Sequence, residues 1–315
     1  MMFDFLFNAF QLGEFLATGL RLSVPLVFAA IGGLICERAG VFNIALEGQL
    51  LLGAFAAALG AYLTGNAFGG LAATLFVGAA SGVLLAYVSI TLRVNQIVVG
   101  IAIILFSIGF TSFMSRIAFE GGGNSLMLEG FMPVAIPYLA DIPVIGRVLF
   151  NQDLLFYLML TVVVVTQVVL FRTQLGLNIR AIGENPGAAD AAGVPVFTLR
   201  YLCVIAGSTI CALGGAYLVL SQIFLFSDNM SAGKGFIGLA AIVLGRWNPV
   251  LALLACLLFG LLDALQLRMQ FQHPEVPYQI FAALPYLIAI LALVGLIGQA
   301  RPPAAAGKPY DREMR

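Results

Sequence analysis

The sequence predicts an all-α protein: a polytopic transmembrane helical bundle with roughly eight to ten spans, some of them broken or re-entrant. Of its 315 residues, 61% are hydrophobic and 10% are charged, whereas about 25% of the residues of a soluble domain are charged. The mean hydropathy is +1.04, and one spanning helix needs about 20 apolar residues. The chain therefore leaves no room for a soluble catalytic domain.

Apolar stretches of suitable length follow one another along most of the chain. We expect spans, in order, at residues 15–36, 44–64, 70–92, 96–115, 152–171, 198–222, 236–246, 249–267 and 278–298. The seventh is too short to cross a bilayer alone, because a helix rises about 1.5 Å per residue. Residues 1–300 form one transmembrane domain in this interpretation, and the charged, Pro- and Ala-rich residues 301–315 form a disordered cytoplasmic tail.

The positions of Lys and Arg predict which loops face the cytoplasm, because these residues accumulate in short cytoplasmic loops. With residues 172–197 placed inside, ten basic residues fall inside and four outside. The inner set is Arg38, Arg93, Arg172, Arg180, Arg200, Arg246, Arg301, Lys308, Arg312 and Arg315, and the outer set is Arg116, Arg147, Lys234 and Arg268. We expect an outside N-terminus and an inside C-terminus.

Two polar segments are longer than tight turns. The outer one, 116–151, mixes a run of three glycines and three prolines with apolar residues, which suits a short interfacial helix. The inner one, 172–197, contains a short Ala-rich helix that would begin at Pro186, after an Asn185 cap, and end at Gly193. A helix held outside the bilayer would offer a docking surface to a soluble partner. The alternative is an ordinary loop between spans.

The first interruption of the apolar pattern lies between the first two spans. Gly40 and Asn43 break or cap the backbone, Glu47 follows four residues later, and Glu37 and Arg38 can pair near the inner interface. A carboxylate at most about 10 Å beyond the break is costly in a membrane and usually faces a cavity or a partner. Alternatively, Glu47 stabilises its own helix N-terminus or pairs with Arg38.

A second interruption occurs at residues 231–249, where a half-length apolar segment lies between Gly233 and Gly245. Short, glycine-interrupted segments in both halves of a transporter indicate a site built from broken helices. The alternative is a re-entrant packing element that binds no ligand.

Several enzyme classes lack their motifs in this chain. No GxxxxGK[ST] phosphate-binding loop and no GxSxG motif occur, and His273 is the only histidine, which excludes a nucleotide-hydrolysing loop and disfavours a zinc enzyme. A net charge of +0 gives no field for nucleic acid. Cysteines occur only inside apolar segments, at Cys36, Cys203, Cys211 and Cys256, and are expected to be packing residues.

Four stretches of sequence are more specific than the hydropathy profile. ERAGVFNIALEGQLLLGAFAAALGAYLTGN from Glu37, NQIVVGIAI from Asn95, RAIGENPGAADAAGV from Arg180 and GKGFIGLAAIVLGRWNP from Gly233 closely resemble permease subunits of bacterial ABC importers. The specific branch resembles the simple-sugar and nucleoside permeases related to ribose and branched-chain amino-acid permeases, and within it the shorter nucleoside permease paralogue. The resemblance covers residues 15–300. Lys234 stands where the family's pattern leads us to expect arginine.

The resemblance implies a permease subunit, not an enzyme, in the inner membrane. Its implied partners are a longer permease subunit, an extracytoplasmic substrate-binding lipoprotein and a cytoplasmic ATPase that holds the ATP and Mg²⁺; no cofactor is expected on this chain. Candidate residues of the substrate path are Phe42, Asn43, Glu47, Gln96 and Phe236. Residues 180–193 would form the ATPase-coupling helix, with Arg180, Glu184, Asn185, Pro186, Ala188, Ala189, Asp190 and Gly193 as candidate contacts.

Two other transport mechanisms fit the membrane body. A proton-coupled secondary transporter would use Glu47 as its proton carrier, and a ligand-gated pore would need no energy source. ATP dependence of uptake separates the importer from the first alternative. The solute would be a nucleoside or another small molecule.

Overall fold

The computed structural model describes residues 9–119, 127–135, 137–138, 142, 145–272, 277, 279–281, 283, 287, 290 and 301–311. Its helices are α1 (Ala9–Arg38), α2 (Leu46–Thr64), α3 (Ala67–Ala86), α4 (Gln96–Ala118), α5 (Ile145–Leu149), α6 (Leu154–Arg172), α7 (Gln174–Glu184), α8 (Pro186–Ala191), α9 (Val196–Tyr217), α10 (Lys234–Leu244) and α11 (Pro249–Gln272). Wider π-helical turns extend α3 over Tyr87–Thr91 and α9 over Leu218–Ile223. Strands β1 (Val134–Ala135) and β2 (Asn151–Gln152) form one short antiparallel pair.

Seven helices in the described part of the chain are long and apolar enough to cross a membrane. They coincide with the predicted spans that begin at residues 15, 44, 70, 96, 152, 198 and 249, and so confirm the all-α polytopic class. The short span predicted at 236–246 is α10, with only 11 residues. Most of the span predicted at 278–298 lies outside the described residues.

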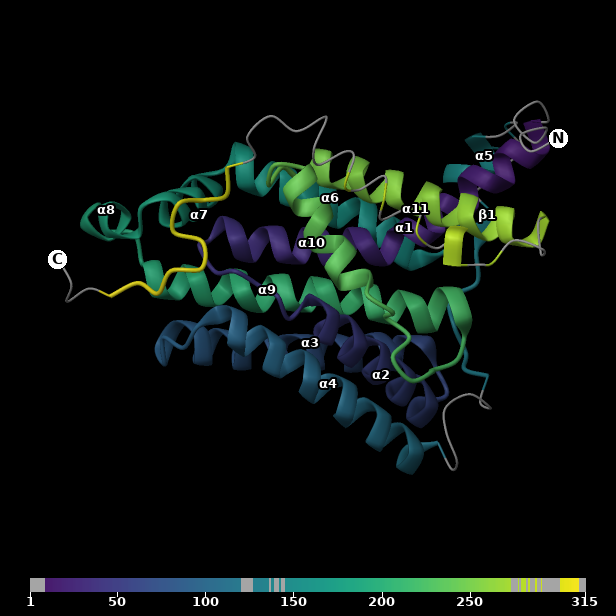
Figure 1. Ribbon diagram of the computed structural model, residues 1–315, viewed down its shortest axis with the longest axis horizontal. Coiled ribbons are helices and arrows are strands. Elements are labelled where there is room, and N and C mark those ends of the chain that lie inside the picture. Colours follow the sequence, from purple (N-terminus) through teal and green to yellow (C-terminus); the bar gives the residue numbers. More distant parts are fainter. Residues whose placement is uncertain are drawn as a thin grey trace.

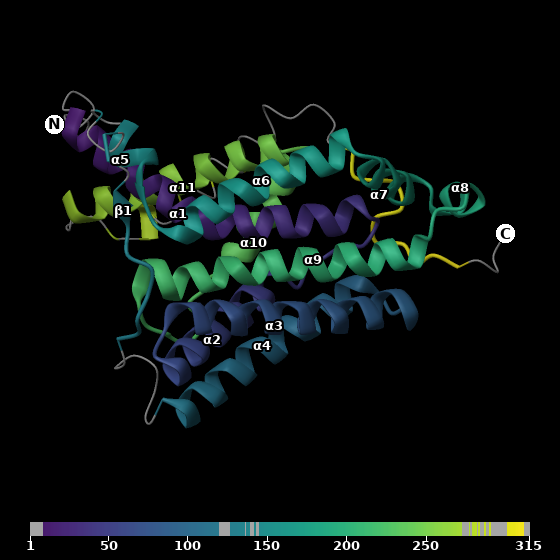
Figure 2. The ribbon, with the colours of Figure 1, turned by 180° about the vertical axis from the view of Figure 1, so that it is seen from behind.

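Helices α1, α2 and α9 form the centre of the bundle. They are largely buried, whereas α3, α4, α6 and α11 bury a much smaller share of their spans. Figures 1 and 2 show α9 and α1 side by side in the middle, with α2, α3 and α4 on one side and α6 and α11 on the other. The exposed apolar side chains of the outer helices, such as Phe76 and Leu105, are of the kind that lipid or a partner subunit covers.

Small residues let neighbouring helices approach closely. A Cβ on Gly207 would overlap the Gly32 carbonyl oxygen, and one on Gly78 would lie 2.8 Å from the Ala212 side chain. Close backbone contact of this kind is typical of membrane helices. All four cysteines are buried and free, in agreement with their predicted packing role.

The C-terminal segment differs from its prediction. Residues 301–311 are not a disordered tail; they lie against α7 and the start of α9 (Figure 1, yellow segment near the C label). The Ala305 amide donates to the Gly183 carbonyl at 2.9 Å, and Pro303 and Ala305 are buried. Composition indicated disorder, but main-chain hydrogen bonds and two small buried side chains suffice to dock this segment. Residues 312–315 lie outside the described part.

Candidate solute path and coupling surface

The chain is unwound between α1 and α2, where the first break is predicted. Gly40 has φ +86°, a left-handed conformation that favours glycine. Asn43 is fully buried; its side-chain oxygen accepts from the Ala45 amide at 3.0 Å and its nitrogen donates to Gln49 Oε1 at 3.1 Å. Gln49 in turn donates to the Ser208 hydroxyl of α9 at 2.8 Å. Asn43 therefore ties the unwound segment to α2 and α9.

Gln96 fastens the same unwound segment to α4. Its Oε1 accepts from the Phe42 amide at 2.7 Å, and Gln96 itself is buried. Because Phe42 lies in a non-helical stretch without a helical partner for its N–H, this bond satisfies a main-chain donor. Phe42 is partly exposed, and the bond holds Gln96 next to Phe42 and its neighbour in the chain, Asn43.

Glu47 joins the two breaks. Its Oε1 accepts from the Ser231 hydroxyl at 2.6 Å and the Gly233 amide at 2.8 Å, and its Oε2 accepts from the Gly235 amide at 2.7 Å. These donors surround the first turn of α10, where helical N–H groups lack partners and the helix dipole favours negative charge. Residue 235 must be glycine-sized, since a Cβ would overlap the Glu47 backbone. The carboxylate in the first turn of α2 thus caps α10.

This geometry bears on the alternatives for Glu47. Its carboxylate does not pair with Arg38; Arg38 donates to the Trp247 carbonyl at 2.9 Å, and Glu37 accepts from the Trp247 indole. The pairing of Glu37 with Arg38 suggested by the sequence is thus replaced by a shared contact with Trp247. Glu47 is 4% exposed, and both its oxygens have protein donors. Whether it also lines a solute route in the assembled transporter stays a prediction.

The remaining path residue, Phe236, is 49% exposed on α10. Two cavities, of about 280 and 260 Å³, are lined by none of the five predicted path residues. The described chain therefore brings Phe42, Asn43 and Gln96 together, joins Glu47 to the start of α10, and leaves Phe236 on the surface. The role of this set as a path remains a prediction.

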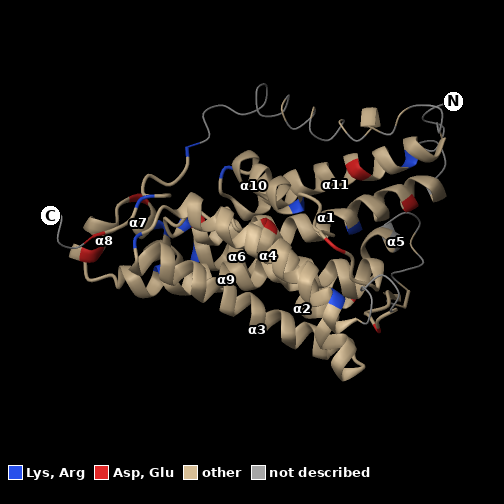
Figure 3. Cartoon of the chain, turned by 60° about the horizontal axis from the view of Figure 1, so that its bottom comes forward, with Lys and Arg blue, Asp and Glu red and all other residues tan. Residues whose placement is uncertain are grey.

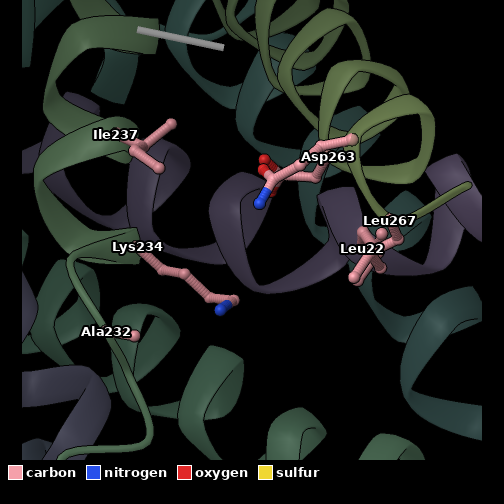
Figure 4. Close-up of a pocket in the computed structure, with 7 residues that line it drawn as sticks. Leu22, Ala232, Lys234, Ile237, Asp263 and Leu267 are labelled. Atoms are coloured by element: carbon pink, nitrogen blue, oxygen red, sulfur yellow. The ribbon is translucent and has the colours of Figure 1, made fainter. Parts of the chain in front are cut away.

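One cavity with charged residues in its lining escaped the sequence interpretation. It has a volume of about 280 Å³ and is lined by Lys234 from α10, Asp263 from α11 and Leu22 from α1, together with Ala232, Ile237, Gln266 and Leu267. Figure 4 shows Lys234 and Asp263 reaching into the same space. The available signal was the occurrence of ionisable residues in or beside apolar spans, which are costly and usually functional. Nothing in the sequence shows that residues 29 positions apart on two helices meet.

The predicted coupling segment forms two helices, α7 and α8. The Asn185 side chain accepts from the Ala188 amide at 3.0 Å, Pro186 occupies the first turn of α8, and Gly193 follows with φ +85°. The predicted cap, start and stop of the short helix are therefore confirmed. Figure 1 shows α8 at the end of the bundle, outside the packed spans.

The outer face of α8 is narrower than predicted. Ala188, Ala191 and Ala192 are exposed, but Ala189 is 5% exposed and belongs to the apolar core. Because residues three apart share a helix face, Ala189 follows Pro186 toward the protein while Ala188 and Ala191 point outward. Ala189 is therefore a packing residue of this chain, a correction to its predicted place on the outer face.

The polar residues of the coupling segment already have contacts within the chain. Asp190 accepts from the Tyr310 hydroxyl at 3.0 Å, and Glu184 Oε2 accepts from the Ala304 amide at 3.3 Å. The Arg180 guanidinium lies over the Phe171 ring, 5.2 Å from its centroid. These residues were predicted to contact a partner subunit. In this chain they already contact the C-terminal segment and α6.

Basic residues gather at the end of the bundle that carries α7 and α8, as Figure 3 shows. Several of the basic residues that were predicted to face the cytoplasm have contacts at this end of the bundle. Arg38 and Arg180 both stack on Phe171, Arg93 pairs with Asp311, and Arg200 donates to the Lys308 carbonyl. The distribution is the one that the positive-inside rule associates with the cytoplasmic face.

We expect cysteine labelling to confirm this orientation. Met127 is 87% exposed, Ala191 is exposed, and the native cysteines are buried, so background labelling should be low. In intact cells a membrane-impermeant maleimide should label Met127→Cys but reach Ala191→Cys only after permeabilisation. Labelling of Ala191→Cys alone in intact cells would invert the topology.

Comparison with known proteins places the chain in a transporter family. A family model described as "Branched-chain amino acid transport system / permease component" matches residues 15–294. The guanosine ABC transporter permease protein NupQ of Bacillus subtilis is 35% identical over 304 residues, covering 93% of this chain and 95% of its own length. The nucleoside ABC transporter permease protein NupC of Lactococcus lactis subsp. cremoris is 35% identical over 299 residues, covering 91% of this chain and 93% of its own length.

A third relative, the putative glucose ABC transporter permease protein TsgC13 of Haloferax volcanii, is 35% identical over 316 residues, covering 92% of this chain and 94% of its own length. No solved structure gives a significant match. The family match spans nearly every described helix, and its members are permease subunits that work with other transporter components. The chain belongs to the family of branched-chain amino acid transport system permease components, and it is a multi-pass transmembrane permease subunit, not an enzyme.

Proposed function

We propose that this permease is one half of the membrane channel of an ABC importer for nucleosides or a similar small solute, in a bacterial cytoplasmic membrane. It would work with a second, longer permease, an extracytoplasmic binding lipoprotein and a cytoplasmic ATPase that holds ATP and Mg²⁺. The names of the relatives support this class of solute. One is named a guanosine transporter permease, one a nucleoside transporter permease and one a putative glucose transporter permease.

The observation that carries the proposal is α8. It is a capped helix that lies at the basic end of the bundle, with Ala188, Ala191 and Ala192 exposed. The chain carries no phosphate-binding loop, so the energy of ATP must enter through a contact with another subunit. A short helix with small outward side chains suits close seating in a groove of a soluble ATPase.

The contacts of Glu47 weigh against the proton-coupled alternative. A proton carrier must exchange protons with water, yet Glu47 is buried and accepts three hydrogen bonds, two of them from main-chain amides at the start of α10, which its side chain would have to leave in order to reach water. We propose that the solute path instead passes along the face where the two breaks meet and is completed by the second permease.

Uptake by reconstituted transporter tests the proposal. The permease and the subunits encoded beside its gene are placed in liposomes, and entry of radiolabelled guanosine, uridine and glucose is followed with and without ATP. We expect uptake of at least one nucleoside that requires ATP and persists in the presence of a protonophore, since ATP hydrolysis and not a proton gradient would drive it. Uptake that proceeds without ATP and collapses with the protonophore would establish the secondary transporter.

A further inference from the structure

The C-terminal segment, residues 301–311, contacts α7, α8, α9 and Arg93, which precedes α4. Its first contacts are with the end of α7. The Ala305 amide donates to the Gly183 carbonyl at 2.9 Å, and the Ala304 amide donates to the Glu184 carboxylate at 3.3 Å. Carbonyls in the last turn of a helix lack partners within the helix. The segment thus completes the helix that leads directly into α8.

Tyr310 then joins the segment to α8 itself. Its hydroxyl donates to Asp190 Oδ2 at 3.0 Å, and its ring centroid lies 5.7 Å from that of Phe197 on α9. Asp190 is one residue before the end of α8. The segment is therefore attached to the coupling helix by a charge-assisted hydrogen bond, a stronger contact than one between neutral groups.

Arg200 connects the same segment to the first break. This side chain is 1% exposed; its Nε donates to the Ala39 carbonyl at 3.1 Å and its Nη1 donates to the Lys308 carbonyl at 3.5 Å. Its guanidinium carbon lies 6.0 Å from the centroid of the Tyr310 ring. A Cβ on Gly40 would approach Arg200 Nη2 to 2.7 Å, so the guanidinium lies directly against the unwound segment.

The end of the segment reaches the element that holds the other side of the break. Asp311 pairs with Arg93, whose Nη2 lies 3.1 Å from Asp311 Oδ1. Arg93 precedes α4, which begins at Gln96, the residue that binds the Phe42 amide. Contacts accordingly run from α8 through Tyr310 and Arg200 to Ala39 and Gly40. Separate contacts run through Asp311 and Arg93 to the residues just before α4, where Gln96 binds the Phe42 amide.

We propose that the C-terminal segment, with Tyr310 and Arg200 as positioning residues, transmits the movement of α8 to the unwound segment 39–45. The inference rests on the proposed function, because α8 must be the contact for the ATPase. The amides of residues 39–41 still bond to main-chain carbonyls near the end of α1, whereas the amides of Phe42 and Ala45 have side-chain acceptors, on Gln96 and Asn43. Because residues 42–45 lack a helical hydrogen-bond ladder, they can change partners at lower cost than a packed helix. The planar guanidinium of Arg200 holds two carbonyls in fixed relation, which an ammonium would not.

The test measures solute transported per ATP hydrolysed in liposomes that contain the complete transporter. Tyr310→Phe removes only the hydroxyl, and Arg200→Lys keeps the positive charge but not the planar guanidinium that bonds to two carbonyls. Each is expected to lower the ratio about 2- to 10-fold, the range that one lost hydrogen bond produces. Binding of the ATPase and its hydrolysis should persist. Deletion of residues 302–315 is expected to lower the ratio further.

Lys308→Ala is the matched control. Its side chain is exposed and only its carbonyl is used, so the ratio should stay at the wild-type value. In a double-mutant cycle, Asp190→Ala combined with Tyr310→Phe should lower the ratio no more than the stronger single change, because both remove the same bond.

Two results would overturn the inference. One is a wild-type ratio in both Tyr310→Phe and the truncated chain; the other is a higher ratio after truncation, which would make the segment a brake. The proposed function is judged separately, by wild-type uptake. If wild-type transporter takes up solute with ATP while the variants are unaffected, only the inference about the C-terminal segment fails. If wild type shows no ATP-driven uptake, both fail.

Discussion

Replacing Ala191 with tryptophan is expected to abolish ATP-driven uptake while the permease still folds and inserts. Ala191 is exposed at the end of α8 and belongs to the face that we assign to the ATPase. Excess bulk between two packed surfaces typically costs about 1–3 kcal/mol, which corresponds to a roughly 5- to 150-fold weaker contact. Uptake, co-purification of the ATPase and thermal stability of the permease in detergent are the measurements.

Leu63→Trp is the matched control, because Leu63 is 72% exposed near the opposite end of the bundle. It should leave ATPase association intact. Ala189→Trp is expected to behave differently from Ala191→Trp and to destabilise the permease itself, since Ala189 is buried in this chain. Full uptake and normal ATPase association in Ala191→Trp would remove α8 from the coupling surface.

Glu47→Ala is expected to produce the largest loss of stability. The change leaves the buried Ser231 hydroxyl, the buried Gly235 amide and the partly buried Gly233 amide without an acceptor. Each unsatisfied buried group costs about 1–3 kcal/mol, so the loss should be on the order of 3 kcal/mol or more. The unfolding midpoint in detergent measures it, and Glu129→Ala, at an exposed carboxylate, serves as the control.

Glu47→Gln separates the structural role from a role in the path. Glutamine keeps one acceptor oxygen but presents its amide group to the other donors, so the structural role predicts a smaller loss of stability, with uptake falling in proportion. A normal unfolding midpoint with no uptake would instead assign Glu47 to the solute path.

Local features of the structure were predictable from the sequence. The spans follow from hydropathy, and the cap at Asn185, the start at Pro186 and the stop at Gly193 follow from rules that involve only a few neighbouring residues. The breaks before α2 and α10 were visible as Gly40, Asn43 and Gly233. Each of these depends on the chemistry of a short window, and the structure agrees with each.

Contacts between distant residues were not predictable. Glu47 and Gly235 are 188 residues apart, and no periodicity relates them. The C-terminal segment was predicted to be disordered because composition measures the capacity to form a core, whereas this segment docks through main-chain amides and a few side chains, among them Tyr310 and Asp311. Ala189 was misassigned because a helix of six residues is too short for its pattern to distinguish the inner face from the outer one.

Site-specific cross-linking tests the central claim, that α8 contacts the ATPase, most directly. A photoreactive amino acid is placed at Ala191 or, as a control, at Leu63, in the transporter assembled with the subunits encoded beside its gene. The account predicts a covalent product between residue 191 and the ATPase that increases with irradiation and is absent at residue 63. A product with the ATPase at residue 63 and none at residue 191 would contradict it.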